Sequence, residues 1–186
     1  MTSSIQTPTA SLERQLLLLR HAKSSWAQPT VSDFERGLNE RGRGAAPLMG
    51  RKLRQDQIAV DLILASTAQR VRETLDLLMA EWQLNCPIVW EKRLYLASAE
   101  TIIASLSDLD SWQNPSEFSL RAITRVMVVG HNPGLSELAC HLTGGSYDMP
   151  TAGLVFLEQA ASSWWQGLRS RPWRESKYWK PRELEL

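Results

Sequence analysis

Continuous apolar runs of strand length constrain the fold of this chain more than any other feature. The three predicted central strands cover residues 15–20, 60–65 and 125–130. Runs without polar alternation are typical of strands that are buried on both faces, as in a parallel sheet. Two further strands are predicted at residues 87–90 and 153–158.

Segments with helical spacing of apolar residues lie between these strands. They cover residues 39–54, 68–82, a stretch that starts after residue 98 and continues through 106, and 134–142. Each follows a residue that favours a helix start, and the predicted caps are Asn39, Ser66 with Thr67, Ser98, and Asn132 followed by a proline. Strands that alternate with helices predict a layered α/β fold.

The length of the chain predicts a single domain. A chain of 186 residues can bury a substantial core, and no repeat or change in composition marks a second unit. We expect the polar residues 1–13 to form a flexible extension before a domain at residues 14–186. Residues 108–119, which contain an Asn-Pro pair, predict a loop.

Composition and charge exclude several classes of protein. Lys and Arg total 21 against 20 Asp and Glu, and a net charge of +1 does not suit a protein that coats nucleic acid or an acidic membrane. Three histidines and two cysteines are too few for a disulfide framework and make a Cys/His zinc finger hard to build. The start of the chain lacks a secretory pattern, and no apolar run approaches the roughly 20 residues that span a bilayer. We therefore expect a soluble, cytoplasmic protein without membrane or nucleic-acid partners.

Basic and imidazole side chains follow the three predicted central strands. Arg20 and His21 follow the first strand, Arg70 lies one helical turn after the second, and His131 follows the third. If the strands are parallel neighbours, these four side chains meet at one edge of the sheet, close to two helix N-termini. Guanidinium groups, imidazoles and helix N-termini together favour a tetrahedral oxyanion, most simply phosphate.

Histidine is the nucleophile that this set of residues favours. The sequence contains no acidic metal-binding cluster, no GxxxxGK[ST] loop and no cysteine in a phosphatase-like context. A neutral imidazole attacks phosphorus and leaves again readily near pH 7. Arginines stabilise the charge on the transferred group, which is most of what phosphoryl transfer requires.

Several ordered motifs resemble the histidine phosphatase superfamily, which includes the cofactor-dependent phosphoglycerate mutases. Residues 20–22 (RHA) resemble its RHG signature, residues 66–74 its second-arginine motif, and residues 129–133 its second-histidine motif. The resemblance is strongest to the SixA-type phosphohistidine phosphatases and runs from about Leu16 to Glu158. Further matching segments are RHAKSSW at 20–26, LNERG at 38–42, RLY at 93–95, VVGHNPGLSELA at 128–139 and PTAG at 150–153.

The resemblance implies a fold, a mechanism and a set of site residues. The implied fold is a three-layer α/β/α sandwich with a mostly parallel central sheet, as in phosphoglycerate mutase. His21 would be the nucleophile that becomes phosphorylated, and Arg20, Arg70 and His131 would hold the phosphoryl oxygens. No metal and no organic cofactor are implied.

Two positions depart from the pattern of the mutases and of many sugar-phosphate phosphatases. Leu96 stands where those enzymes carry a general-acid glutamate, and Ala27 stands where an asparagine is common. A general acid contributes roughly 10²–10⁴-fold to the departure of a poor leaving group. Its loss matters less for phosphohistidine, because the leaving imidazole is far less basic than an alkoxide.

These departures favour the phosphohistidine branch. The leading hypothesis is a phosphatase that removes phosphate from protein phosphohistidine, for example on a histidine phosphotransfer domain, or from a small phosphorylated metabolite. Two alternatives stay open. One is a sugar-phosphate phosphatase or a phosphoglycerate mutase-like enzyme, against which Leu96 argues. The other is a non-catalytic phosphate-binding regulatory module, against which the retention of all four pocket residues argues.

Other polar residues receive weaker assignments. Candidates for the rim of the pocket are Lys23, Ser24, Arg36 and Asn132. Glu91 and Glu100 are the nearest carboxylates that could replace the missing acid, although surface or capping roles suit them better, and His141 is expected to be structural or exposed. The tryptophans and basic residues at 162–180 could stack nucleic-acid bases, but a terminal hairpin that covers a sheet edge fits the net charge better.

Overall fold

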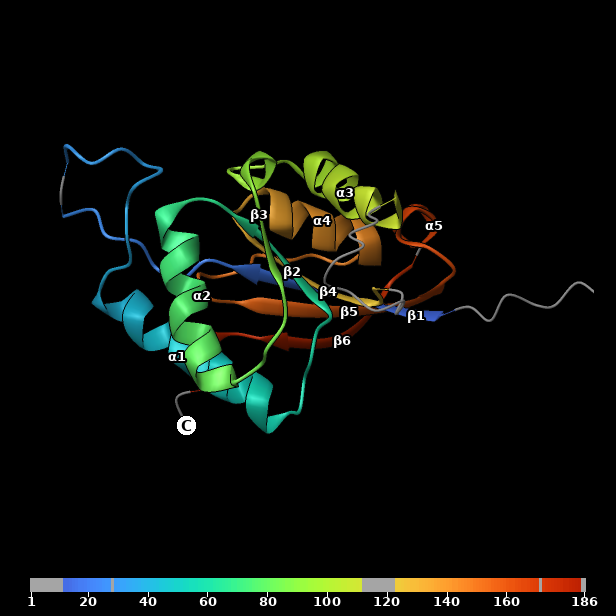
Figure 1. Cartoon of the computed structure of the whole chain (residues 1–186), viewed down its shortest axis with the longest axis horizontal. Coiled ribbons are helices and arrows are strands. Elements are labelled where there is room, and N and C mark those ends of the chain that lie inside the picture. Colours follow the sequence, from blue (N-terminus) through green and yellow to red (C-terminus); the bar gives the residue numbers. More distant parts are fainter. Residues whose placement is uncertain (1–11, 28, 112–122, 171, 185–186) are drawn as a thin grey trace, which may run out of the picture.

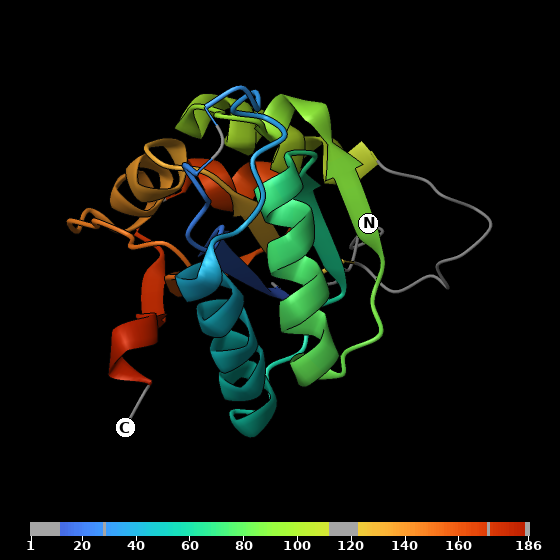
Figure 2. The ribbon, with the colours of Figure 1, turned by 90° about the vertical axis from the view of Figure 1, so that its left-hand side faces the viewer.

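The protein is built around one six-stranded sheet with helices on both faces (Figures 1 and 2). The structure is a computed structural model, and it describes residues 12–27, 29–111, 123–170 and 172–184. The strands are β1 (Leu12–Arg20), β2 (Leu62–Ser66), β3 (Ile88–Glu91), β4 (Arg125–Gly130), β5 (Leu154–Ala161) and β6 (Arg174–Trp179). The helices are α1 (Glu40–Gln55), α2 (Gln69–Trp82), α3 (Ala99–Ser107), α4 (Gly134–Thr143) and α5 (Trp164–Arg169). Short 3₁₀ helices are η1 (Lys92–Leu94), η2 (Asp108–Ser111) and η3 (Pro181–Glu183).

The helices form two layers, one on each face of the sheet. Helices α1 and α2 cover one face, and α3, α4 and α5 cover the other (Figure 1). Alternate residues of the central strands supply the two cores: Leu16 and Leu18 face α3, α4 and α5, whereas Leu17 and Leu19 face α1 and α2. All four leucines are fully buried. The predicted three-layer α/β/α sandwich is therefore confirmed.

The sheet is parallel through its centre and antiparallel at one side. Its strand order is β3-β2-β4-β1-β5-β6, in which β3, β2, β4 and β1 are parallel and β5 and β6 are antiparallel to their neighbours. Arg20 at the end of β1 lies opposite Gly130 at the end of β4, and β2 ends beside β4. The residues that follow these three strands therefore share one edge of the sheet, as predicted.

Strand β1 starts earlier than the sequence predicts. Its pairing with β5 begins at Leu12 opposite Ala161, so antiparallel hydrogen bonding extends the strand beyond its apolar run. Of the predicted extension at residues 1–13, the first eleven residues lie outside the described residues, and Leu12 and Glu13 belong to β1.

Two of the predicted helix caps are confirmed, and two are wrong. Asn39 accepts a hydrogen bond from the backbone N–H of Gly42 at 2.9 Å, and Ser98 caps α3. Ser66 remains in β2, and α2 begins after Ala68 without a side-chain cap. Asn132 is not a cap either, because Pro133 precedes the first residue of α4 and the Asn132 amide bonds elsewhere.

The predicted loop after α3 and the tryptophan-rich tail differ in detail from expectation. The loop starts with the 3₁₀ helix η2, and residues 112–119 of the prediction lie outside the described residues. The tail is not a hairpin by itself: it forms α5 and then β6, and β6 pairs antiparallel with β5, which precedes the tail. Trp164 and Trp173 stack within the core beside α3 and α4 instead of covering a sheet edge, whereas Trp165 is half exposed. Across the described residues, no helix is long and apolar enough to cross a membrane.

Candidate active site

His21 is held where β1 ends by hydrogen bonds of its backbone and of its ring. Its backbone N–H donates to the carbonyl of Gly130 at 3.0 Å, and its backbone carbonyl accepts from Ala152 at 3.1 Å. In the ring, Nδ1 lies 2.7 Å from the carbonyl oxygen of Ala22, and Nε2 lies 3.2 Å from Nε of Arg70. A carbonyl oxygen only accepts and a guanidinium only donates, so Nδ1 carries the proton and Nε2 presents its lone pair. This is the protonation state of a nucleophilic imidazole.

Arg70, in the first turn of α2, joins the groups of the site. Its guanidinium donates through Nε to His21 and through Nη2 to Nδ1 of His131 at 3.3 Å. It also donates through Nη1 to the backbone carbonyl of Asp33 at 2.5 Å and through Nη2 to the Asp33 carboxylate at 3.0 Å. The side chain is only 4% exposed. Two guanidinium nitrogens thus face imidazole lone pairs, where they could bind the oxygens of a phosphoryl group on His21.

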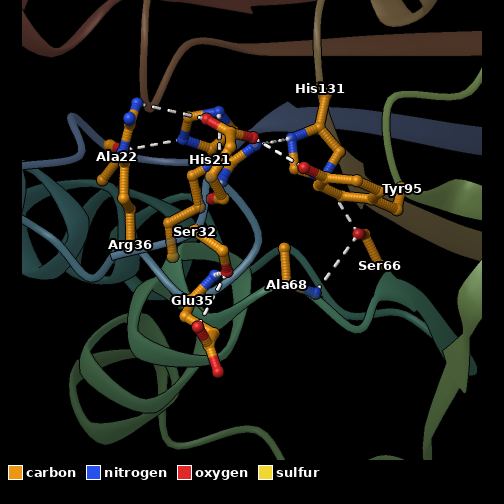
Figure 3. Close-up of polar contacts among 11 residues, drawn as sticks. His21, Ala22, Ser32, Glu35, Arg36, Ser66, Ala68, Tyr95 and His131 are labelled. Carbon is orange, nitrogen blue, oxygen red and sulfur yellow. Dashed lines mark hydrogen bonds and ion pairs between the residues drawn. The ribbon is translucent and has the colours of Figure 1, made fainter. Parts of the chain in front are cut away.

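His131, just after β4, lies beside His21 with the two ring centroids 5.0 Å apart. Because Nδ1 accepts from Arg70, the proton of the neutral ring is on Nε2, which donates to the hydroxyl of Ser66 at 2.9 Å (Figure 3). Ser66 in turn accepts from the backbone N–H of Ala68 at 3.4 Å. The residue predicted to cap α2 therefore supports the second histidine.

Burial keeps both imidazoles neutral. Desolvation is the largest cause that lowers the pKa of His21 to about 4 and that of His131 to about 3. The cations Arg70 and Arg20 lower both pKa values further, whereas the carboxylate of Asp33 raises them. Near pH 7 both rings are uncharged, and His21 can attack without first losing a proton.

Arg20 reaches the site from the last position of β1. Its Nη1 donates to the carbonyl oxygen of Met149 at 2.7 Å, which also accepts from the Asn132 amide at 3.1 Å. Burial lowers the pKa of Arg20. Its Nε is buried and has no hydrogen-bond partner among the residues that the structure describes. A buried donor without a partner is costly, so this N–H is a candidate ligand for an incoming anion.

Two residues of the site were missed by the sequence reasoning. The carboxylate of Asp33 accepts from Arg70 and, at 2.7 Å, from the hydroxyl of Tyr95. The ring of Tyr95 contacts the ring of His131 edge-on at 5.4 Å. Tyr95 lies in the RLY segment at 93–95 that resembles the SixA-type proteins, so this resemblance could have pointed to it. Asp33 lies in a polar loop without periodicity, and its sequence context carries no signal.

The remaining sequence candidates occupy the surroundings of the site. Arg36 stacks on Trp26 at 3.9 Å and approaches Asp33 at 3.4 Å, so it does lie at the rim. Lys23 lines a neighbouring pocket of about 540 Å³ with Arg41, Lys180 and Arg182, and Ser24 forms a backbone bridge to Leu38.

Three further candidates lie away from the histidines or on the surface. Glu91 pairs with Arg93, and Glu100 and His141 are exposed. Arg72, two residues after Arg70, stacks on Trp90 at 4.2 Å. Across the part of the chain that the structure describes, no group of three or more His, Cys, Asp and Glu side chains could hold a metal ion.

Known proteins share both the sequence and the fold. Residues 16–95 match the family described as histidine phosphatase superfamily (branch 1). An uncharacterized chloroplastic protein of Arabidopsis thaliana is 32% identical over 161 residues, which cover 85% of this chain and 72% of that protein.

Two solved structures are similar over nearly their whole length. The putative phosphohistidine phosphatase SixA from Agrobacterium tumefaciens has a TM-score of 0.72 at 31% identity, over 92% of this chain and 100% of that one. The protein histidine phosphatase SixA complexed with tungstate has a TM-score of 0.74 at 19% identity, over 92% and 99% of the two chains, and supports the fold alone. Together with the geometry around His21, these matches show that the chain belongs to the histidine phosphatase superfamily and is a phosphatase of the SixA type.

Proposed function

We propose that this protein removes phosphate from phosphohistidine on another protein through a phospho-His21 intermediate. The observation that carries the proposal is the state of His21, whose Nδ1–H donates to Ala22 while the lone pair of Nε2 faces Arg70. An imidazole fixed in this way is a nucleophile with a guanidinium beside the atom that attacks.

The first step transfers the phosphoryl group to His21. Its Nε2 forms a bond to phosphorus while the bond between phosphorus and the substrate nitrogen breaks, and the leaving imidazole takes the electron pair. Nε and Nη2 of Arg70, with the buried Nε of Arg20, can donate to the phosphoryl oxygens. The proton stays on Nδ1, where it is hydrogen-bonded to the carbonyl oxygen of Ala22. His21 can therefore later leave phosphorus as a neutral imidazole.

The position of the general acid in related enzymes supports phosphohistidine over sugar phosphates. Leu96 occupies that position, and its side chain is 54% exposed at the surface. A leaving imidazole can be protonated by solvent on its far nitrogen, so it needs no acid at the bond that breaks. An alkoxide has no second basic site, and without an acid its departure is slower by roughly 10²–10⁴-fold.

The surroundings of the histidines suit a protein substrate. Three large apolar side chains are exposed there: Trp26 (68%), Phe34 (39%) and Leu96 (54%). Trp26 stacks on Arg36, Phe34 contacts Tyr95, and Leu96 is the next residue after Tyr95. Exposed apolar groups gathered in this way are typical of surfaces that contact another protein. A histidine phosphotransfer domain is one substrate of this kind.

Trapping of the intermediate tests the proposal. The protein is mixed with a radiolabelled phosphohistidine protein and quenched, and the label on the enzyme is tested for the acid lability and base stability of phosphohistidine. We expect a labelled wild type, no label in His21→Ala, and an unchanged label in His141→Ala, since His141 is an exposed residue of α4. Absence of the adduct from the wild type, or full activity of His21→Ala, would refute the mechanism.

The substrate class is tested by turnover of a phosphohistidine protein and of several sugar phosphates at equal concentrations. We expect clear preference for the phosphohistidine protein, and preference for the sugar phosphates would reverse the assignment. Binding of vanadate without turnover of any phosphodonor would show a regulatory phosphate-binding module instead. We expect turnover to persist in EDTA, because arginines already supply the positive charge beside the phosphoryl group.

A further inference from the structure

We propose that Asp33 is a catalytic residue whose carboxylate accepts a proton from the water that hydrolyses phospho-His21. This inference rests on the proposed function, because it concerns the second half of the same reaction. Leu96 stands where related enzymes carry a glutamate, and of the two replacements considered from the sequence, Glu91 pairs with Arg93 and Glu100 is exposed.

The contacts of Asp33 place its carboxylate next to the expected phosphoryl site. Its Oδ2 accepts from Nη2 of Arg70 at 3.0 Å, and the same nitrogen lies 3.3 Å from Nδ1 of His131. Nε of that guanidinium contacts Nε2 of His21, the atom that becomes phosphorylated. One planar group thus joins the carboxylate to the nucleophile and to the second histidine.

Asp33 is also open to solvent. Its side chain is 45% exposed, whereas the side chain of Arg70 is 4% exposed. A leaving group departs opposite Nε2 of His21, toward solvent, and the attacking water then takes the vacated position. The carboxylate is oriented through Oδ2 by Tyr95 and Arg70, while Oδ1 has only a long contact of 3.4 Å with Arg36. Oδ1 is therefore the atom available to a water molecule.

The charges around Asp33 suit a base that works after phosphorylation. In the free protein the hydrogen bond from Tyr95, followed by the charges of Arg70 and Arg36, lowers the pKa of the carboxyl group. A phosphoryl group on His21 brings negative charge to Arg70 and opposes that effect, so the carboxylate binds a proton more readily at the stage when water attacks.

Hydrolysis of phospho-His21 transfers one proton from water to Asp33. The water oxygen forms a bond to phosphorus, one of its protons moves to Asp33, and the bond between phosphorus and Nε2 of His21 breaks with its electron pair returning to the ring. His21 leaves as a neutral imidazole because Nδ1 still carries its proton. Hydrogen phosphate departs, and Asp33 releases the proton to solvent.

The other nearby carboxylates form their hydrogen bonds and ion pairs with residues other than Arg70 and the two histidines. Glu73 accepts from the backbone N–H of Leu38 and pairs with Arg43. Glu35 accepts from the hydroxyl of Ser32 (Figure 3). Among the described residues, Asp33 is the carboxylate that bonds to the arginine between the two histidines.

The test uses p-nitrophenyl phosphate, whose leaving group needs no acid, with the full-length Asp33→Asn variant in rapid mixing. We expect a burst of about one equivalent of nitrophenolate at the wild-type rate, because phosphorylation of His21 does not use the base. Steady turnover then falls by roughly 10²–10⁴-fold, and the phosphorylated fraction of the enzyme rises toward one. Glu35→Gln, the same charge change two residues away, should behave as the wild type.

A merely structural role gives a different result. If Asp33 only positions Arg70, the burst slows together with turnover and no phosphoenzyme accumulates, which would overturn the proposal. As a second variant, Asp33→Ala should regain turnover when formate is added. If formate does not restore turnover and no phosphoenzyme accumulates, the proposal is likewise overturned. A wild type without phospho-His21 would instead refute the proposed function itself.

Discussion

The two buried histidines should make the stability of this protein fall steeply on mild acidification. An unfolded histidine titrates near 6.5, whereas burial lowers the pKa of His21 to about 4 and that of His131 to about 3. Both side chains are almost fully buried, at 8% and 2% exposure. Below 6.5 the unfolded chain therefore binds protons that the folded protein excludes. Stability is complete above 6.5 and is lost as the pH falls toward the folded pKa values.

The size of the effect follows from the same values. Between about pH 8 and about pH 5, each imidazole costs about 2 kcal/mol of unfolding free energy, at 1.36 kcal/mol per pKa unit. The pair together costs about 4 kcal/mol, a large part of the roughly 5–15 kcal/mol that stabilises a typical domain. The carboxylates contribute little in this interval, because they ionise at lower pH.

Urea unfolding at the two pH values measures this loss. We expect the wild type to lose about 4 kcal/mol more than the double variant His21→Gln/His131→Gln, which has no buried imidazole to protonate. His141→Gln, at an exposed position of α4, should lose as much as the wild type. Equal losses in the wild type and the double variant would refute the linkage between burial and acid sensitivity.

Three further outcomes follow from the geometry. Gly42→Ala should lower the unfolding free energy, measured in urea, by more than about 2 kcal/mol, because a Cβ there would lie 2.2 Å from the carbonyl oxygen of Lys23. Gly44→Ala in the same helix has open space around the new Cβ and should raise the unfolding free energy by about 0.5–1 kcal/mol. Vanadate binding should move the proton of His131 from Nε2 to Nδ1, since Nδ1 must carry a hydrogen to donate to an anion and the hydroxyl of Ser66 can donate to Nε2 in return, and ¹⁵N chemical shifts that keep Nε2 protonated in the complex would contradict this. Leu96→Glu should raise turnover of sugar phosphates by at least about 10-fold with little change for phosphohistidine, and an unchanged ratio of the two activities would count against a missing general acid.

The sequence predicts the parts of the site that follow from local chemistry. Continuous apolar runs define β1, β2 and β4, and their parallel pairing brings the residues after them to one edge. His21, Arg70 and His131 meet there as expected, because each stands directly after a strand or in the first turn of the following helix. No knowledge of side-chain contacts is needed for this step.

Contacts between distant segments account for what the sequence did not reveal. Ser66 and Asn132 look like helix caps in sequence. In the folded protein the hydroxyl of Ser66 instead bonds to His131, and the amide of Asn132 donates to the carbonyl of Met149. Asp33 reaches Arg70 across 37 positions from a loop whose path has no periodicity to read. Tertiary hydrogen bonds of this kind become visible only when the chain is folded.

The hydrogen bonds of Arg70 explain how the site can be ordered before it binds anything. Four of its five N–H groups already bond to His21, His131 and Asp33, and those that face the two imidazoles can exchange these partners for the oxygens of an incoming phosphoryl group. The partners that it displaces are imidazole lone pairs, which accept weakly compared with a dianion. The bond from Nη1 to the backbone carbonyl of Asp33 is not among them, and it keeps the plane of the guanidinium fixed during the exchange. The arginine therefore loses its conformational entropy when the protein folds, and orienting it adds no further cost during catalysis.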